Sequence, residues 1–251
     1  MFIKVFKMIY KPFNINADLA EGFNIEESIM PYIDSCNLAC GGHSGDLILI
    51  KKVVAIAQKN HVKIGAHPSY PDKENFGRKV MKLTVSELYQ SIRNQIKLLL
   101  EVIPIHELHH VKPHGALYHS CIADIKTASV FLDVIKEVCP KTIIFTLPNS
   151  QLEKLANKNG ITVWREAFMD RVYLEDGKLL PRSETGSIHN TIENLYHQFY
   201  YLIHEQKVLT IEKSWIDMKS DTICIHGDHA NSVTNLITIL NLYNQKRIPN
   251  E

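Results

Sequence analysis

Long hydrophobic runs are missing from this sequence, and no stretch approaches the roughly 18 consecutive apolar residues that a membrane-spanning helix needs. The N-terminal stretch MFIKVFKMIYK is interrupted by Lys4 and Lys7 and has no small-residue cleavage site, which argues against a signal peptide. We therefore expect a cytoplasmic protein that does not contact a membrane.

An excess of charge of one sign is also missing. The 28 Lys and Arg residues nearly balance the 27 Asp and Glu residues, and a net charge of +1 gives no overall field that would attract nucleic acid. The 5 cysteines are too few and too scattered for a disulfide scaffold. Cys36, Cys40 and His43 have a spacing that could belong to a zinc site. No second cysteine pair follows, so buried free thiols are the favoured interpretation.

Several standard motifs are absent as well. The sequence contains no G-x-x-x-x-G-K-[ST] phosphate loop, no G-x-G-x-x-G after the first predicted strand, no G-x-S-x-G and no H-E-x-x-H. Histidine, in contrast, is abundant, with 13 residues, many of them beside Gly, Pro or Asp. The chemistry of this protein must therefore be sought in its histidines and their neighbours.

Short β-rich segments alternate with helical patterns along the chain. The predicted strands are residues 13–18, 35–40, 62–67, 109–114, 141–148, 161–168 and 221–228. The clearest predicted helices are residues 46–60, 84–102, 187–205 and 229–244, and Thr84 with Glu87 has the pattern of a capping box. This alternation indicates βαβ units and a parallel sheet. Because no linker divides the 251 residues, we predict an α/β fold, a single (β/α) barrel-like domain over residues 1–251 with about seven parallel strands. An open doubly wound sheet is the alternative.

Polar clusters follow most of the predicted strands. They are NADLAEG, CGGHSGD, AHPSYPD, KPHGALYH, REAFMDR and HGDH. The carboxyl ends of parallel strands share one face of the fold, where barrels and open sheets bind ligands. Turn formation explains the Gly and Pro residues in these clusters. It does not explain four histidines that follow four different strands: His43, His67, His114 and His226. We therefore predict one functional site at this face.

Individual residues in the clusters have more than one interpretation. Asp18 could act as a general base or bind a metal, whereas Asp46 could simply cap the helix that follows it. Arg78 could bind a carboxylate in a bidentate manner or form a surface salt bridge. Lys112 and His114 alternate along their predicted strand and would present a cation and an imidazole to one pocket. The other candidates for ligand binding are Glu21, His43, His67, Asp72, Glu166, Arg171, His226 and Asp228, while His109 and His119 are treated as bystanders.

Several segments together resemble one known family. The motifs are NADLAEGF (16–23), CNLACGGHSGD (36–46), IGAHPSYPDKENFGRK (64–79), VKPHGALYH (111–119), EAFMDRVY (166–173), GKLLPRSE (177–184) and CIHGD (224–228). In this order, and over nearly the whole chain, they resemble the LamB/YcsF family. The departures are mild: the family usually has Gly at Ala20, Ala at Cys36 and Met169, and an aromatic residue at Gly42. Because Gly42 has no side chain where the family has an aromatic residue, it would widen the pocket beside His43.

The resemblance implies a fold similar to the barrel of the polysaccharide deacetylases. It also implies ATP-dependent opening of 5-oxo-L-proline, a cyclic amide, to L-glutamate, together with two partner subunits, B and C. Whether this chain or a partner binds ATP stays open. For this reaction Asp18 or His114 is the expected base. Lys112 would face the developing oxyanion or a phosphate, and Arg78 would bind the ligand carboxylate.

Two other functions stay open. Asp and His residues after barrel strands can hold a divalent metal, which would make the protein a metal-dependent hydrolase or deacetylase, although no ligand pair has close helical spacing. Alternatively, the pocket only presents a ligand to partner subunits without doing chemistry. The density of titratable groups argues against this non-catalytic role.

Overall fold

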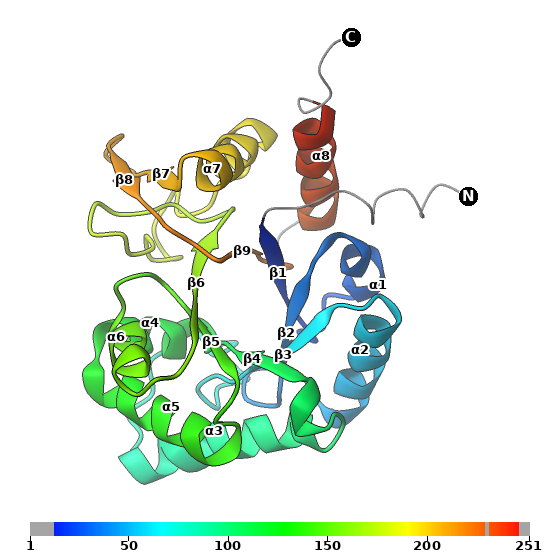
Figure 1. Cartoon of the computed structure of the whole chain (residues 1–251), viewed down its shortest axis with the longest axis vertical. Coiled ribbons are helices and arrows are strands. Elements are labelled where there is room, and N and C mark those ends of the chain that lie inside the picture. The colour runs from blue at the N-terminus through cyan, green and yellow to red at the C-terminus, as the bar shows by residue number, and fades with distance from the viewer. Residues whose placement is uncertain (1–12, 229–230, 246–251) are drawn as a thin grey trace.

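A computed structural model of the chain describes residues 13–228 and 231–245 (Figure 1). Its strands are β1 (Asn14–Leu19), β2 (Ser35–Ala39), β3 (Lys63–His67), β4 (Leu108–Val111), β5 (Ile143–Thr146), β6 (Val163–Phe168), β7 (Lys207–Leu209), β8 (Trp215–Asp217) and β9 (Thr222–Ile225). Its α-helices are α1 (Glu26–Ile29), α2 (Leu47–Lys59), α3 (Val85–Leu100), α4 (Gly115–Ala123), α5 (Ile125–Val138), α6 (Gln151–Lys158), α7 (Ile192–His204) and α8 (Ser232–Gln245). None of the helices in these ranges combines the length and apolar character that a membrane crossing needs.

The central feature is a closed barrel with the strand order β1-β2-β3-β4-β5-β6-β9, in which every neighbouring pair is parallel. It closes because β9 pairs with both β1 and β6. Helices lie around the outside of the strands (Figure 1). The barrel confirms the predicted fold and excludes the open sheet.

Successive side chains along β1 point alternately toward the helix layer and into the barrel interior. Ile15 and Ala17 are fully buried in the hydrophobic core. Asn16 points to the other side, where its amide donates to the Thr222 hydroxyl on β9 at 2.8 Å. Asp18 follows the same alternation. The barrel interior is therefore polar, and this explains why the first predicted strand alternates apolar residues with Asn and Asp.

Local capping sets several helix boundaries. The predicted capping box is present, since the Thr84 hydroxyl accepts from the Glu87 N–H and the Glu87 carboxylate accepts from the Thr84 N–H. The helix predicted from residue 187 begins only at Ile192, because Thr191 caps it and the carbonyl of Ser187 is bound by the preceding loop. The first residues of the helix predicted at 229–244 lie outside the described residues, and α8 begins at Ser232.

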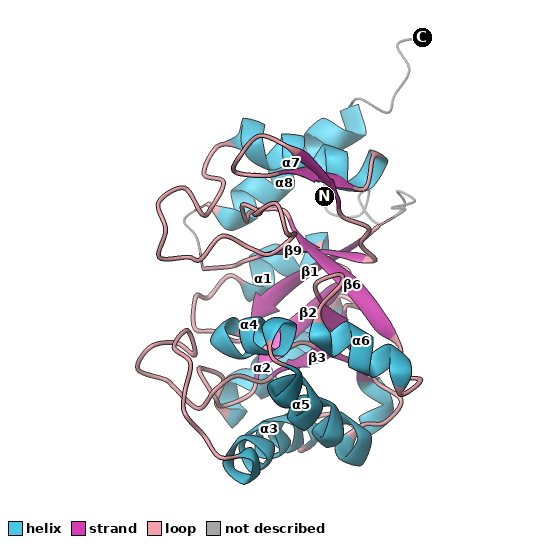
Figure 2. Cartoon of the chain, turned by 90° about the vertical axis from the view of Figure 1, so that its left-hand side faces the viewer, coloured by secondary structure: helices cyan, strands magenta, loops and turns pink. Residues whose placement is uncertain are grey.

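The segment between β6 and β9 was the least predictable part of the barrel. It holds an irregular loop, α7 and the short antiparallel pair β7–β8, which the sequence pattern did not predict. Helices α7 and α8 lie together at one end of the molecule (Figure 2).

All five cysteines are buried and free, which is the interpretation that the sequence favoured. Burial raises the pKa of Cys36 and of Cys40 to about 12, so neither thiol ionises readily.

Candidate active site

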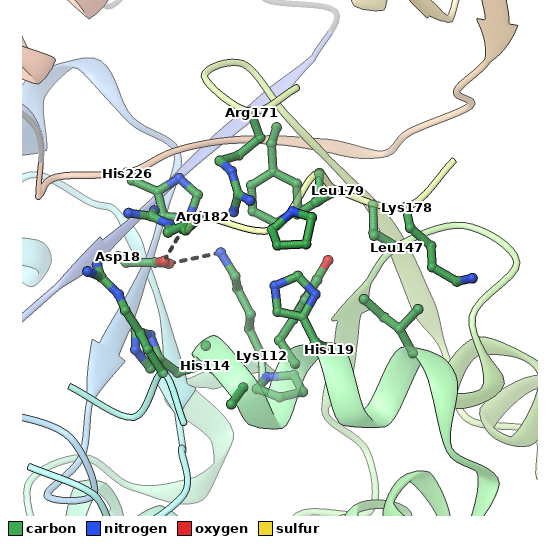
Figure 3. A pocket seen from close by; sticks show the side chains of 18 of the residues that line it. Asp18, Lys112, His114, His119, Leu147, Arg171, Lys178, Leu179, Arg182 and His226 are labelled. Atoms are coloured by element: carbon green, nitrogen blue, oxygen red, sulfur yellow. Dashed lines mark hydrogen bonds and ion pairs between the residues drawn. The ribbon is translucent and has the colours of Figure 1, made fainter. Parts of the chain in front are cut away.

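The polar clusters meet at the carboxyl end of the barrel, where the structure has a cavity of about 670 Å³. The predicted site residues that line it are Asp18, Glu21, His67, Arg78, Lys112, His114, Arg171, His226 and Asp228. Figure 3 shows side chains from separate strands and loops pointing into this common space. The structure therefore brings together residues as distant in the chain as Asp18 and Asp228.

Lys112 is buried at the floor of the cavity, directly after β4. Its Nζ atom lies 2.9 Å from Asp18 Oδ1 and 2.9 Å from Glu166 Oε1. The ammonium also donates to Cys224 Sγ at 3.2 Å. Burial on its own lowers the pKa of Lys112, but the surrounding groups, Asp18 foremost, outweigh burial and hold the pKa well above its ordinary value. A charged ammonium group is thus fixed at the floor of the cavity.

Asp18 lies near the end of β1 and Glu21 just beyond that strand. Both are buried, but their environments differ. Asp18 Oδ1 accepts from Lys112 and, at 2.7 Å, from the Asn37 amide. Asp18 Oδ2 lies 3.3 Å from His67 Nε2. Burial raises the pKa of Asp18, yet His67 and Lys112 outweigh it and hold that pKa well below its ordinary value. Burial and the nearby Asp18 charge raise the pKa of Glu21 well above its ordinary value. Two carboxyl groups whose pKa values are pushed apart suit acid–base chemistry.

His67 and His114 face each other beside these carboxyl groups. His67 Nδ1 lies 2.9 Å from the carbonyl oxygen of Lys112. His114 Nε2 lies 3.0 Å from the carbonyl oxygen of Phe76. Because a carbonyl oxygen only accepts, these partners assign the ring proton to both of those nitrogens. The opposing atoms, His67 Nε2 and His114 Nδ1, are 3.0 Å apart and hold lone pairs in neutral rings. Two lone pairs at this distance require a proton or a cation between them.

A group of four residues has the composition of a metal site: Asp18, Glu21, His67 and His114 offer ligand atoms that lie within 4.8 Å of one another. Two imidazole nitrogens with two carboxylate oxygens suit zinc and similar divalent ions. Each histidine directs its second ring nitrogen to a backbone carbonyl, which is how proteins orient metal-binding imidazoles. These four residues could therefore hold a divalent metal.

The opposite wall of the cavity comes from the segments after β6 and β9. His226 Nδ1 lies 2.9 Å from Asp170 Oδ2. Asp228 binds Arg182 Nη1 at 2.7 Å and also binds Arg78. The Arg78 side chain is 42% exposed, and its guanidinium is already engaged by Asp228. The role of carboxylate clamp that we expected for Arg78 stays a prediction, and Asp228 would compete with a substrate carboxylate for its guanidinium.

Four predicted site residues do not line the cavity: His43, Asp46, Asp72 and Glu166. Asp46 is exposed and caps α2 by accepting from the Leu49 N–H at 2.8 Å, which is the structural alternative considered from the sequence. Asp72 accepts from the Asn75 N–H at 3.1 Å and so stabilises a turn. Both residues build local structure.

His43 and Glu166 lie behind the residues that line the cavity. The His43 ring stacks on His114 with 3.6 Å between ring centroids, and its Nε2 lies 2.9 Å from Glu21 Oε1. Glu166 pairs with Lys112 as described above. These two residues support the site without facing its open space.

The strand assignment of Lys112 and His114 was wrong in detail. Strand β4 ends at Val111, so Lys112 lies just beyond it and His114 immediately precedes α4. Gly42 also behaves differently from the expectation that it widens the pocket beside His43. A Cβ at Gly42 would lie 2.2 Å from Gln95 Oε1, so the Gln95 side chain fills the space that a larger residue would occupy.

Sequence reasoning missed two supporting residues and dismissed one that lines the cavity. Asn37 accepts from His110 Nε2 at 2.6 Å and donates to Asp18, so it links the barrel interior to the site. Arg182 lines the cavity, and so does His119, which was treated as a bystander. The available signal for Asn37 was a polar residue within an otherwise apolar strand segment.

Comparison with known proteins identifies the family. A model described as the LamB/YcsF family matches residues 13–250. The chain belongs to the LamB/YcsF family. This confirms the resemblance drawn from the sequence motifs.

Individual relatives match over most of their length. The A subunit of the 5-oxoprolinase of Pyrococcus furiosus is 37% identical over 227 residues, which cover 88% of this chain and 89% of that protein. The protein of the same name from Pyrococcus abyssi is 38% identical over 223 residues, covering 86% and 88%. The crystal structure of the lactam utilization protein from Thermus thermophilus superposes with a TM-score of 0.83 and 33% identity, covering 92% of this chain and 97% of that one.

Proposed function

We propose that this LamB/YcsF protein opens the cyclic amide 5-oxo-L-proline to L-glutamate as one component of an ATP-dependent 5-oxoprolinase. The observation that supports it most directly is the charged Lys112 ammonium, fixed beside the ionised Asp18 carboxylate at the floor of the cavity. The names of the similar proteins support the choice of substrate.

Opening a lactam needs a base for water and a cation for the oxyanion. A five-membered lactam is a resonance-stabilised amide, and its carbonyl oxygen becomes negatively charged when water attacks the carbonyl carbon. Lys112 would stabilise this oxygen, and removal of one such donor typically costs about 3–4 kcal/mol. In the assembled enzyme the γ-phosphoryl group of ATP would pass to the lactam oxygen as ADP leaves. Water then adds to the activated carbon, the C–N bond breaks and the ring nitrogen gains the proton, which leaves an acyl phosphate. A second water molecule releases phosphate, so ATP, the lactam and two water molecules become ADP, phosphate and glutamate.

His114 fits the role of base better than Asp18. Asp18 already accepts from Lys112 and Asn37, and its pKa is held low, so it has little tendency to take a proton. His114 Nδ1 lines the cavity and lies 3.4 Å from Glu21 Oε1. Burial, with the neighbouring His43 and His67, lowers the pKa of His114 well below its ordinary value, so the ring is neutral and its Nδ1 lone pair is available to a water molecule. Positioned acid–base groups typically contribute about 10²–10⁴-fold in rate. His114 would take the proton from water and return it to the ring nitrogen.

The ATP requirement and the two partner subunits, B and C, are part of the proposal. The sequence has no standard phosphate loop, so we assign the activation of the lactam by ATP to the assembled enzyme. The similar Pyrococcus proteins are named as one subunit of an enzyme, which supports a multi-subunit assembly.

A second candidate function is metal-dependent hydrolysis of an amide. The observation that favours it is the group formed by Asp18, Glu21, His67 and His114, which would hold the metal. A bound divalent ion would polarise the substrate carbonyl or lower the pKa of a water molecule. In that case Lys112 would keep its place as the cation paired with Asp18.

One experiment separates these functions. Conversion of labelled 5-oxo-L-proline to glutamate is measured with the isolated chain and with the chain plus its two partner subunits, each with and without ATP and a chelator. The proposal expects conversion only with ATP and partners. Conversion that needs a metal but neither ATP nor partners would establish the second candidate instead. Near wild-type turnover of both Lys112→Ala and His114→Ala in the complex would leave this chain a ligand-presenting subunit.

A further inference from the structure

Arg171 is a buried cation at the wall of the cavity, and no carboxylate of the described residues pairs with it directly. The residue is 2% exposed, and it forms no ion pair within residues 13–228 and 231–245. The two acidic residues whose charges act on it are engaged elsewhere, since Asp170 binds His226 and Asp228 binds Arg182. A buried charge without a direct counter-charge is costly, which makes this arginine unusual.

Backbone carbonyls fix the orientation of the Arg171 guanidinium. Nη2 donates to the Leu180 carbonyl at 2.6 Å, and Nε donates to the Ser187 carbonyl at 3.4 Å. A guanidinium has five N–H donors in a rigid fork, so these two bonds leave further donors available. Figure 3 shows the side chain of Arg171 pointing into the cavity. The group is therefore held in place by its loop while part of its fork faces the open space.

The wall around Arg171 has a surplus of positive charge. Arg78 and Arg182 share the single carboxylate of Asp228. Burial, together with the nearby Arg182 charge, lowers the pKa of Arg171 to about 10, although Asp170 and Asp228 partly oppose this effect. An anion placed between the guanidinium groups would relieve the repulsion and supply the missing counter-charge.

We infer that Arg171, assisted by Arg182, forms an anion subsite that binds the carboxylate of the lactam substrate. The inference rests on the proposed function, because it assumes that a lactam occupies the same cavity. The Lys112 side chain reaches the cavity from the end of β4, and the Arg171 side chain reaches it from the segment after β6 (Figure 3). A ring whose carbonyl oxygen lies at Lys112 would direct a carboxylate toward Arg171. The subsite would then select 5-oxoproline over lactams that lack this group.

The test compares two lactams that differ only in the carboxylate, and it includes inorganic phosphate as a simple anion. Binding of 5-oxo-L-proline, of 2-pyrrolidinone and of inorganic phosphate to the full chain is measured by calorimetric titration at neutral pH. The variants are Arg171→Gln, Arg182→Gln and, to keep the charge, Arg171→Lys. The matched control is Arg165→Gln, because Arg165 lies on β6 and pairs with Glu153 outside the cavity.

The wild type and R165Q should bind 5-oxo-L-proline at least about tenfold more tightly than 2-pyrrolidinone, as a charge-assisted bond predicts. In R171Q the preference should vanish while 2-pyrrolidinone binding stays unchanged, which also shows that the cavity is still folded. R171K and R182Q should retain part of the preference for 5-oxo-L-proline. If R171Q does not fold, the reduced preference of R182Q tests the subsite instead.

Three results would overturn the inference in different ways. Equal binding of both lactams by the wild type removes the subsite but leaves lactam binding, and so the proposed function, intact. Binding of neither lactam counts against both. Phosphate that binds through Arg171 without displacing 5-oxo-L-proline would show an anion site that serves a second ligand rather than the lactam carboxylate.

Discussion

The Nε2 atom of His67 faces the Nδ1 atom of His114 at 3.0 Å, and the carbonyl partners of the two rings leave neither of these atoms a proton when the rings are neutral. Glu21 and Asp18 complete the group. In the second candidate function these atoms are metal ligands and His114 is not the base. The purified chain, stripped with a chelator, should then bind one divalent ion from a series of Zn²⁺, Mn²⁺ and Mg²⁺. His67→Gln and His114→Gln should each weaken binding by at least about tenfold.

His109 is the control for this prediction, because it is a half-buried histidine that does not line the cavity. His109→Gln should bind the ion as the wild type does. Native mass spectrometry and calorimetric titration measure the stoichiometry and the affinity. If none of the ions binds at millimolar concentration, the two nitrogens share a proton, and the group serves acid–base chemistry alone.

Removal of the Lys112 charge should destabilise the protein strongly at neutral pH. Lys112→Met would leave the buried carboxylates of Asp18 and Glu166 without their counter-charge, at a cost of about 3–5 kcal/mol. The loss should shrink at acid pH, where the Asp18 carboxyl group can take up a proton. Denaturant unfolding measures it, with Lys136→Met as control because the exposed Lys136–Asp133 pair contributes little. A loss that is equally small in both variants would contradict the charge assignment.

Glu21→Gln should stabilise the protein at neutral pH. The pKa of Glu21 is raised in the folded state, so ionisation of Glu21 opposes folding once the pH exceeds the ordinary glutamate value. The gain from the neutral amide should be absent below about pH 4 and should grow with rising pH, by about 1.4 kcal/mol per unit of raised pKa. Thermal unfolding between pH 4 and 8 in the presence of a chelator measures it. A gain that does not change with pH would show a packing effect instead.

The fold was predictable because its signals are local. Strand β1 shows its alternation in the letters NINAD, and Thr84 with Glu87 marks the start of α3. The short pair β7–β8 was missed because three-residue strands have too little periodicity to be recognised. The late start of α7 depends on the Thr191 cap and on the Ser187 carbonyl, which accepts from the Val172 N–H in the preceding loop. No local pattern reveals the second of these contacts.

The site was predictable as a place but not as a set of contacts. Convergence follows from topology, since residues after parallel strands must share one face. The partner of each side chain depends on three-dimensional packing. Asp46 and Asp72 have the same residue type as Asp18, and only the structure separates a helix cap and a turn from a buried carboxylate.

His110 should act on Asp18 through Asn37. The His110 Nε2 donates to Asn37 at 2.6 Å, and its ring stacks on Phe145 at 3.9 Å. His110→Phe would keep an aromatic ring there but leave the Asn37 oxygen unsatisfied, which costs about 1–3 kcal/mol. Turnover in the assembled enzyme should fall about tenfold through kcat, with KM little changed. The control is His106→Phe, an exposed position. Unchanged kcat in H110F would confine the role of His110 to packing.

Ala20 places a strained backbone conformation directly beside the site. Its φ is +60°, a left-handed value that costs a residue with a Cβ about 1–2 kcal/mol, and the LamB/YcsF pattern usually has Gly there. Leu19 and Ala20 separate Asp18 from Glu21, so the turn at Ala20 sets the relative placement of the two carboxyl groups. Ala20→Gly should stabilise the protein by about 1 kcal/mol, because the relief of strain exceeds the added entropy of the unfolded chain. Chemical denaturation measures the change.

The exposed His61 also has a left-handed φ, of +56°, and His61→Gly should stabilise the protein by a similar amount. If His61→Gly stabilises and Ala20→Gly does not, the methyl group of the fully buried Ala20 contributes packing that offsets its strain.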